Sequence, residues 1–148
     1  MAGDVVEIRR AKAEDIDKVA ELLSAAKLPL AGVSECIERF FVAEASGTIV
    51  GSVGIEKHGN YGLLRSAAVS EALRGRGVGR RLVDEAIDDA RDEGIRALYL
   101  LTTTAQDYFP EFGFERIDRE LVPVELNASA ELQGACPSSA TVMRVGLD

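Results

Sequence analysis

Residues 61–81, with the sequence YGLLRSAAVSEALRGRGVGRR, limit the possible folds more than any other stretch of the chain. From Gly62 to Val69 the stretch is mainly apolar, and its length is typical of a strand buried on both faces. After a short polar connection, three glycines alternate with other residues, the last of them being Gly79. An amphipathic pattern then continues for about fifteen residues, as in a helix. The predicted order is therefore strand, glycine-rich turn, helix.

This turn is well suited to binding an anion. Glycine accepts backbone dihedral angles that other residues resist, so several N–H groups can point to one place. The N-terminus of the following helix adds further N–H groups and a favourable dipole. A flexible, arginine-rich surface turn would explain the glycines but not their position between a buried strand and a helix. The dinucleotide-binding motif G-x-G-x-x-G, if it started at Gly75, would need a glycine at position 80, where this chain has Arg80. The Gly-Lys-Ser/Thr sequence that ends a P-loop is also absent.

The charge of the chain is unevenly distributed. Its net charge is −8 and its pI is near 4.7, which argues against nucleic acid as a partner. Residues 65–81 nevertheless contain five arginines and a single acid, Glu71. A basic segment on an acidic protein favours a phosphorylated small ligand. A high-salt, halophilic source would also explain the acidity, and composition does not decide between these origins.

Length and composition predict one globular domain, residues 1–148. No run reaches the ~18 apolar residues of a membrane span, and the N-terminus lacks the basic-then-apolar order of a signal peptide. Two cysteines, Cys36 and Cys136, do not make a disulfide framework. We therefore expect a cytoplasmic protein with no membrane partner.

The hydrophobic pattern of the remaining chain predicts strands and helices in alternation. A helix is expected from Ala13 until Pro29 stops it, and Gly94 is expected to end the helix after the glycine turn. His58 is expected in a turn with the two residues after it. Strands are expected at residues 5–9, 39–45, 48–56, 62–69, 96–101, 114–117 and 141–147, with short helices at 34–37, 108–112 and 123–133.

Residues 74–79, RGRGVG, follow a strand that ends Ala67-Ala68-Val69, and they resemble the Q/R-x-x-G-x-G/A motif of the GNAT superfamily of N-acetyltransferases. The later Phe112-Gly113-Phe114 resembles the end of that family's F-Y-x-x-x-G-F element. The resemblance implies an α/β (α+β) fold with a central, mixed but mostly antiparallel sheet of about seven strands, flanking helices, and strands 4 and 5 splayed apart. It also implies acetyl-CoA as co-substrate and no metal.

The resemblance assigns coenzyme A to the turn and to the strand before it. The pantetheine arm would pair with the strand end like an added strand, and an N–H near Val69 would polarise the thioester carbonyl. Thr102 stands where many members have a cofactor-binding asparagine, and Phe109 is expected to pack near the cofactor's sulfur. Tight sheet packing explains the two alanines equally well, and Thr102 could instead cap the next helix. The implied cofactor residues are Ala67, Ala68, Val69, Arg74, Gly75, Arg76, Gly77, Val78, Gly79, Arg80, Thr102 and Phe109.

The acid that protonates the leaving thiolate is the main departure from the family pattern. Members usually have a tyrosine at the position of Phe109, whereas this chain has Tyr108 one residue earlier. One residue rotates a helical side chain by about 100°, so Tyr108 is a candidate acid, with water or release as free thiolate as alternatives. Glu44 and Glu56, expected on neighbouring strands, are candidate bases. An exposed position on a hairpin would explain Glu44 equally well, and the single histidine, His58, is interpreted as a solvated turn residue.

Arg65 is a charged residue inside a strand that is expected to be buried. A buried charge is costly unless it is paired. Arg65 therefore either forms a structural ion pair with Glu44 or Glu56, or binds a substrate carboxylate through two hydrogen bonds. The second interpretation predicts an amino acid, or an amino-acid-like molecule, as the acceptor.

The C-terminal third resembles a subgroup of the family that is associated with arsenic resistance. This resemblance rests on residues 100–105 (LLTTTA), the turn at 112–114, and residues 129–132 (SAEL) and 136–140 (CPSSA). Free cysteines are among the most buried residue types. Cys36 and Cys136 are therefore interpreted as packing residues and not as metalloid ligands.

Together, these features predict transfer of an acetyl group from acetyl-CoA to the primary amine of a small molecule, by direct attack in a ternary complex. An amino acid or an amino-acid-like toxin is the preferred acceptor. A non-catalytic acyl-CoA-binding or sensing domain and a protein N-acetyltransferase are the alternatives. Homodimers are common in the family, so a homodimer is one expected assembly.

Overall fold

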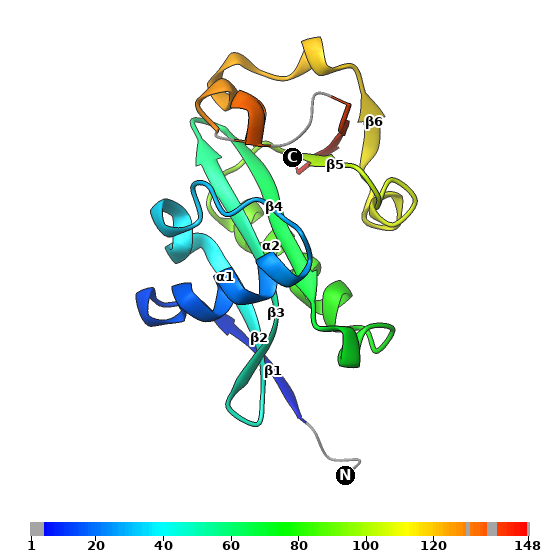
Figure 1. Cartoon of the computed structure of the whole chain (residues 1–148). Helices are drawn as coiled ribbons and strands as arrows, with labels where there is room; N and C mark the ends of the chain where they lie inside the picture. Colours follow the sequence, from blue (N-terminus) through cyan, green and yellow to red (C-terminus); the bar gives the residue numbers. More distant parts are fainter. Residues whose placement is uncertain (1–4, 130, 136–138, 148) are drawn as a thin grey trace. The chain divides into compact units, whose positions relative to one another are not determined.

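The computed structural model describes residues 5–129, 131–135 and 139–147 (Figure 1). The chain forms two compact units. The first contains the residues up to Gly54 together with Ser66–Ala86, and the second contains Ile55–Arg65 and the residues from Ile87 onward. The divisions fall within two strands, β3 (Thr48–His58) and β4 (Tyr61–Val69), and within the helix α2 (Val78–Asp92), so each of these three elements contributes to both units.

Seven strands form one sheet in the order β1-β2-β3-β4-β5-β7-β6. The pairs β1–β2, β2–β3, β5–β7 and β6–β7 are antiparallel, whereas β4 and β5 are parallel. This arrangement confirms the predicted mixed, mostly antiparallel sheet. The remaining strands are β1 (Val6–Arg10), β2 (Phe40–Ala45), β5 (Ala97–Thr102), β6 (Glu115–Ile117) and β7 (Thr141–Gly146).

The pairing of β4 with β5 is short. The register joins Tyr61–Leu63 to Ala97–Tyr99, although β4 continues to Val69. Ser66, further along β4, has a left-handed φ of +59°, and its carbonyl accepts a hydrogen bond from Ser52 Oγ at 2.8 Å. A left-handed residue interrupts the regular extension of a strand. The early end of the pairing agrees with the splayed strands expected at this place.

Two α-helices, α1 (Ile16–Ala25) and α2 (Val78–Asp92), lie on opposite faces of the strands in the first unit (Figure 1). Val42 of β2 belongs to the core cluster that includes the buried residues of α1. On the other face, a Cβ at Gly51 of β3 would lie 2.9 Å from Leu82 Cδ1 of α2. The glycine therefore allows α2 to pack closely against the sheet.

Helix α1 ends earlier than the sequence predicts. Its last residue is Ala25, and Lys27 follows in the left-handed region with φ +60°. The N–H groups of Lys27 and Leu28 donate back to carbonyls of the last helical turn at 3.1 and 2.9 Å, which is the bond pattern of a Schellman cap. The predicted stop at Pro29 is therefore wrong, because the backbone has already turned two residues before it.

Short helices complete the chain, and the predicted ones are all present, with bounds shifted by a few residues. The second unit packs Leu63, Tyr99 and Leu126 into its own core cluster. No helix in the described part of the chain has the length and apolar character needed to span a bilayer. The 3-10 helices are η1 (Ala13–Asp15), η2 (Ser34–Arg39), η3 (Glu71–Leu73), η4 (Phe109–Phe112), η5 (Arg119–Leu121) and η6 (Val124–Ala128), and η7 (Glu131–Ala135) is a π-helix.

Candidate functional site

The glycine-rich turn of the first unit connects β4 to α2, as the sequence predicts. Gly75 and Gly77 both have φ +81°, and a Cβ at either position would meet no atom within 4 Å. Glycine is therefore required there by backbone conformation and not by crowding. The carbonyl of Gly77 accepts a hydrogen bond from the N–H of Arg81 at 3.1 Å, which begins α2. The first N–H groups of an α-helix lack partners within the helix, so the turn adjoins donors suited to an anion.

Arginine side chains surround this turn. Arg74, Arg76 and Arg80 are exposed, whereas Val78, the first residue of α2, is buried. Arg74 Nε donates to the carbonyl of Val69 at 3.1 Å, so this side chain ties the turn to the end of β4. The predicted anion-binding segment is thus a basic, exposed turn whose first residue is fixed to the preceding strand.

The residues at the end of β4 differ in how deeply they are buried. Ala68 is buried in the core cluster beside α1, which is the packing role considered for it, whereas Ala67 and Val69 are half-buried. Ser66 precedes them with its left-handed φ, and sequence reasoning missed this residue. No sequence signal was available, because serine has no general preference for that conformation.

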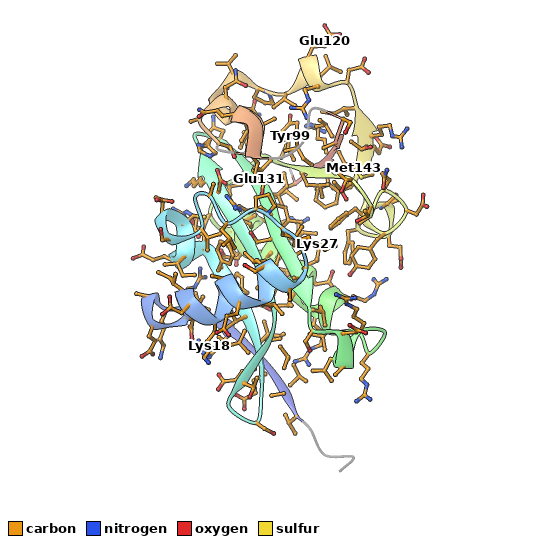
Figure 2. All side chains as sticks on the ribbon, in the orientation of Figure 1. Lys18, Lys27, Tyr99, Glu120, Glu131 and Met143 are labelled. Carbon is orange, nitrogen blue, oxygen red and sulfur yellow. The ribbon has the colours of Figure 1, made fainter. Side chains whose placement is uncertain are left out.

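A buried cluster of charged side chains forms in the second unit from β3, β4 and η7. Arg65 Nη1 donates to Glu56 Oε2 at 2.6 Å, and Arg65 Nε lies 3.4 Å from Glu131 Oε2. The side chain of Arg65 is 0% exposed, and those of Glu56 and Glu131 are 10% and 5% exposed. Figure 2 labels Glu131, which sequence reasoning did not single out. Of the two structural ion pairs considered for Arg65, the one with Glu56 forms.

His58 contacts the same cluster. It is the last residue of β3, its side chain is 20% exposed, and its Nε2 lies 2.9 Å from Glu56 Oε1. The interpretation of His58 as a solvated turn residue is therefore wrong. Residues two positions apart on one strand have their side chains on the same face. The contact between Glu56 and His58 could therefore have been predicted from their spacing if β3 had been known to include His58.

The protonation state of Glu56 follows from these contacts. Burial raises the pKa of its carboxyl group, but hydrogen bonds from His58 and Arg65 outweigh burial and lower the pKa below its ordinary value. Glu56 is therefore ionised at neutral pH and accepts both hydrogen bonds. The Nε2 atom of a neutral His58 then carries the proton, which leaves Nδ1 with the lone pair.

Glu44, the other candidate base, lies in a separate cluster in the first unit. Its Oε1 accepts a hydrogen bond from Arg9 Nε at 2.7 Å, and Arg9 also donates to both oxygens of Asp15 at 2.8 and 3.0 Å. The hydrogen bond to Asp15, and after it the one to Glu44, raises the pKa of Arg9. The hydrogen bond from Arg9 in turn lowers the pKa of Asp15. These three residues line an open cavity of about 410 Å³ together with Lys18, which Figure 2 labels on α1. Glu44 and Glu56 thus have different partners.

The candidate residues around η4 are arranged by aromatic packing. Thr102 ends β5, and its Oγ1 accepts a hydrogen bond from the N–H of Ala105 at 2.9 Å in the turn that follows the strand, whereas the N-cap position of η4 is Tyr108. Tyr108 is half-buried, and its ring packs edge-to-face on Phe109 and Phe112 with centroid distances of 5.2 and 5.3 Å. Phe109 is buried. Its place beside a cofactor sulfur stays a prediction.

The described cysteine is a packing residue. Cys36 packs against the first unit's core, and its Sγ lies 3.2 Å from the carbonyl oxygen of Gly32. The interpretation of Cys136 lies outside the described residues, as does the motif segment 136–138. Where side chains are described, no three of His, Cys, Asp and Glu gather closely enough to hold a metal ion.

Comparisons with known proteins agree with the fold. Residues 7–114 match the model of the Acetyltransferase (GNAT) family. An uncharacterized N-acetyltransferase of Chlorobaculum tepidum is 31% identical over 101 residues, which are 68% of this chain and 64% of that protein. An amino-acid acetyltransferase of Mycobacterium tuberculosis is 29% identical over 129 residues, 80% of this chain and 74% of that protein. The chain thus covers less than two thirds of the first of these relatives.

Solved structures share the fold. The N-acetylglutamate synthase of Neisseria gonorrhoeae, complexed with coenzyme A and N-acetyl-glutamate, superposes with a TM-score of 0.83 and 25% identity. The match covers 99% of this chain and 36% of that one. An acetyltransferase of the GNAT family from Staphylococcus aureus has a TM-score of 0.80, and its match covers 97% of this chain and 100% of that one.

Proposed function

The chain belongs to the acetyltransferase (GNAT) family, and we propose that it transfers the acetyl group of acetyl-CoA to the primary amine of a small molecule. The observation that carries this proposal is the turn between β4 and α2. Its two left-handed glycines, exposed arginines and adjoining helix N-terminus make it suited to a pyrophosphate. The N. gonorrhoeae relative solved with coenzyme A supports the same assignment.

The residues proposed to hold coenzyme A follow the chain from the end of β4 into α2. The backbone of Ala67–Val69 would pair with the pantetheine arm. The N–H groups of residues 74–80 would hold the pyrophosphate, with charge from Arg76 and Arg80. When bound, acetyl-CoA supplies an activated thioester, and the protein's part is to fix its position and to polarise its carbonyl by a backbone N–H near Val69.

We propose an amino acid or a similar molecule as the acceptor. Two relatives support this class: the M. tuberculosis protein is named an amino-acid acetyltransferase, and the N. gonorrhoeae structure contains N-acetyl-glutamate. The neutral amine attacks the thioester carbonyl directly, so that the C–N bond forms as the C–S bond breaks, without an acyl-enzyme. An arsenic-bearing amino acid stays a prediction of the subgroup resemblance, and Arg65 remains the residue proposed for the acceptor's carboxylate.

The proposal includes two candidate bases, Glu56 and Glu44, and one candidate acid, Tyr108. Glu56 would take the amine's proton through His58 or a water, because its own two carboxylate oxygens already accept hydrogen bonds from His58 and Arg65. Glu44 is the second candidate base. Tyr108 is the candidate acid for the leaving thiolate, which otherwise takes its proton from water.

One observation favours a second candidate function. Phe109 fills the place of the family's usual tyrosine and is buried, so no hydroxyl group is available from that position. Binding of acyl-CoA without turnover is therefore the alternative, and a protein N-acetyltransferase is a further one. A cytoplasmic location and a homodimeric assembly also belong to the proposal.

The coenzyme site is tested by a matched pair of glycine variants. Gly77→Ala should weaken coenzyme A binding about tenfold or more, because a left-handed alanine is disfavoured by roughly 1–2 kcal/mol and the turn must change shape. Gly94→Ala is the control: Gly94 has φ +80° and equally open surroundings, but it lies at the C-terminal end of α2. Isothermal titration calorimetry should show intact coenzyme A binding in Gly94→Ala. Equal affinities in the two variants would contradict the assignment of the turn.

Catalysis is tested by an amine screen that records release of free thiol from acetyl-CoA. The panel should contain L-glutamate, phosphinate- and arsenic-bearing amino acids, simple amines and a lysine-rich peptide. Thiol release with amino acids is the expected result. Coenzyme A binding without release from any amine would support the binding-domain alternative, and release with the peptide alone would support the protein acetylase.

A further inference from the structure

The open cavity beside Glu44 is a second place in the first unit where a small molecule can bind. Its volume of about 410 Å³ lies within the range of small-molecule sites. Its walls come from β1, η1, α1 and the hairpin of β2 and β3, all of them in the first unit. Its lining includes none of residues 74–80 of the described turn, so the cavity is separate from the proposed coenzyme site.

The charges around this cavity favour a cation over an anion. Its lining contains three carboxylates, those of Asp15, Glu21 and Glu44, and two cations, Arg9 and Lys18, which is a formal net charge of −1. Arg9 donates one hydrogen bond to Glu44, two to Asp15 and one to a backbone carbonyl. A guanidinium has five N–H donors, so four of them are already used. An anion would therefore gain little from Arg9 and would be repelled by the carboxylates.

Glu44 is the carboxylate that a cationic ligand can reach. Its side chain is 32% exposed, whereas that of Asp15 is only 9% exposed and lies against Arg9. Glu44 accepts the hydrogen bond from Arg9 through Oε1, and a carboxylate has acceptor sites on both oxygens, so it can also accept donors from a ligand. Glu21 is more exposed, and its Oε2 lies 3.9 Å from Lys18 Nζ, which is a weak surface pair. Glu44 is thus the main anionic contact.

Two apolar side chains of the lining define the rest of the ligand. Leu22 of α1 and Ile49 of β3 line the cavity and pack against the core cluster of the first unit. Both side chains are half-buried, so part of their apolar surface faces water. An alkyl chain that covers this surface gains hydrophobic stabilisation, which a bare metal ion does not supply. The lining therefore matches an organic cation.

We propose that this cavity binds a protonated amine that carries a short apolar chain. The ammonium group donates hydrogen bonds to the carboxylate of Glu44, and the chain lies against Leu22 and Ile49. The inference goes beyond the proposed function and does not rest on it, because such an amine binds here without coenzyme A and without being acetylated.

The test compares three probes with the same chain and different charge: hexylamine, hexanol and hexanoate. At pH 7 the amine is protonated, since an alkylamine such as that of lysine has a pKa of about 10.4. In two-dimensional ¹H–¹⁵N NMR without coenzyme A, hexylamine should shift the amide signals of Gly47, Thr48 and Ile49 and should saturate below about 10 mM. Hexanol should bind about tenfold more weakly, because it lacks the charge, and hexanoate should bind more weakly still.

Two variants change the charge of the cavity in opposite directions. Glu44→Gln should weaken hexylamine binding about tenfold and change hexanol binding less than about twofold, because hexanol depends on apolar contact. Lys18→Gln removes a repelling cation whose side chain is 70% exposed, and it should strengthen hexylamine binding about twofold. The matched controls are Glu35→Gln and Lys27→Gln, exposed changes in the same unit outside the cavity lining, and they should alter neither affinity. Figure 2 labels both lysines.

Other results would overturn the inference. These are equal binding of the three probes, amide shifts by hexylamine that leave residues 47–49 unaffected, and hexylamine binding by Glu44→Gln as tight as the parent's. Circular dichroism checks that each variant folds. If Glu44→Gln does not fold, Lys18→Gln decides the question, and hexylamine affinity equal to that of Lys27→Gln would then refute the site. Coenzyme A binding and thiol release are measured separately, so the proposed function and this site can fail independently.

Discussion

Replacing Arg65 by methionine keeps an unbranched, apolar stem but removes the guanidinium that contacts Glu56 and Glu131. Both carboxylates then remain in a site where their side chains are 10% and 5% exposed. Breaking a buried ion pair by removing one partner costs about 3–5 kcal/mol, because the remaining charge is uncompensated. The total free energy of unfolding of a domain is about 5–15 kcal/mol, so Arg65→Met should remove a large share of it.

The loss of stability should depend on pH in a defined direction. In the parent protein the pKa of Glu56 lies below its ordinary value of 4.5, so this group contributes stability above pH 4.5 and loses it as pH falls. In Arg65→Met, burial raises the pKa of the same group, so its charge is a penalty at neutral pH that disappears on protonation. The difference between the two proteins should therefore be largest near pH 7 and should shrink toward pH 4.5.

Urea unfolding followed by circular dichroism measures this prediction, since the chain contains no tryptophan for fluorescence. With an m-value of about 2 kcal/mol per molar urea, the midpoint at pH 7 should fall by roughly 2 M. Arg116→Met, at an exposed position of β6, is the control and should shift the midpoint little. A loss below about 1 kcal/mol at pH 7 would be the value of an exposed pair, and it would refute the reasoning, as would a loss that grows as pH falls.

Two further predictions concern residues near the ends of β4 and η4. Tyr108→Phe keeps the edge-to-face packing on Phe109 and Phe112 but removes the hydroxyl group. If Tyr108 is the acid, kcat for acetyl transfer should fall about 100-fold with KM unchanged. An unaltered kcat would exclude this role. Ser66→Val should lower the free energy of unfolding by about 2 kcal/mol, although valine favours strands, because a β-branched residue is a genuine outlier at φ +59°. Ser66→Gly should cost clearly less in the same urea assay, and a valine variant as stable as the glycine variant would contradict the strain argument.

Local patterns determined much of the fold. The apolar runs, the glycines and the helical periodicities predicted all seven strands and both α-helices, because these signals depend on residues close in sequence. The end of α1 was the exception. Pro29 is a visible stop signal, but the chain turned earlier at Lys27, a residue with no intrinsic preference for a left-handed φ.

The glycine-rich turn between β4 and α2 could be predicted from the sequence for the same reason. Residues 74–80 lie in one segment, so their relation to each other is fixed by the local order of strand, turn and helix. The glycine requirement at Gly75 and Gly77 then followed from backbone sterics alone, and the structure gives both a left-handed φ.

Only the tertiary structure decided how the charged residues pair. Arg65 had two possible partners in sequence, and the sheet register and the C-terminal helices selected Glu56 and added Glu131, which is 66 positions away. His58 changed from a turn residue to a partner of Glu56 because β3 extends to include it. The contact of Arg65 with Glu131 joins segments distant in the chain, and no local pattern of side chains encodes it. The sequence thus determined the strand, turn and helix that suit coenzyme A, whereas long-range packing determined which charges surround Arg65.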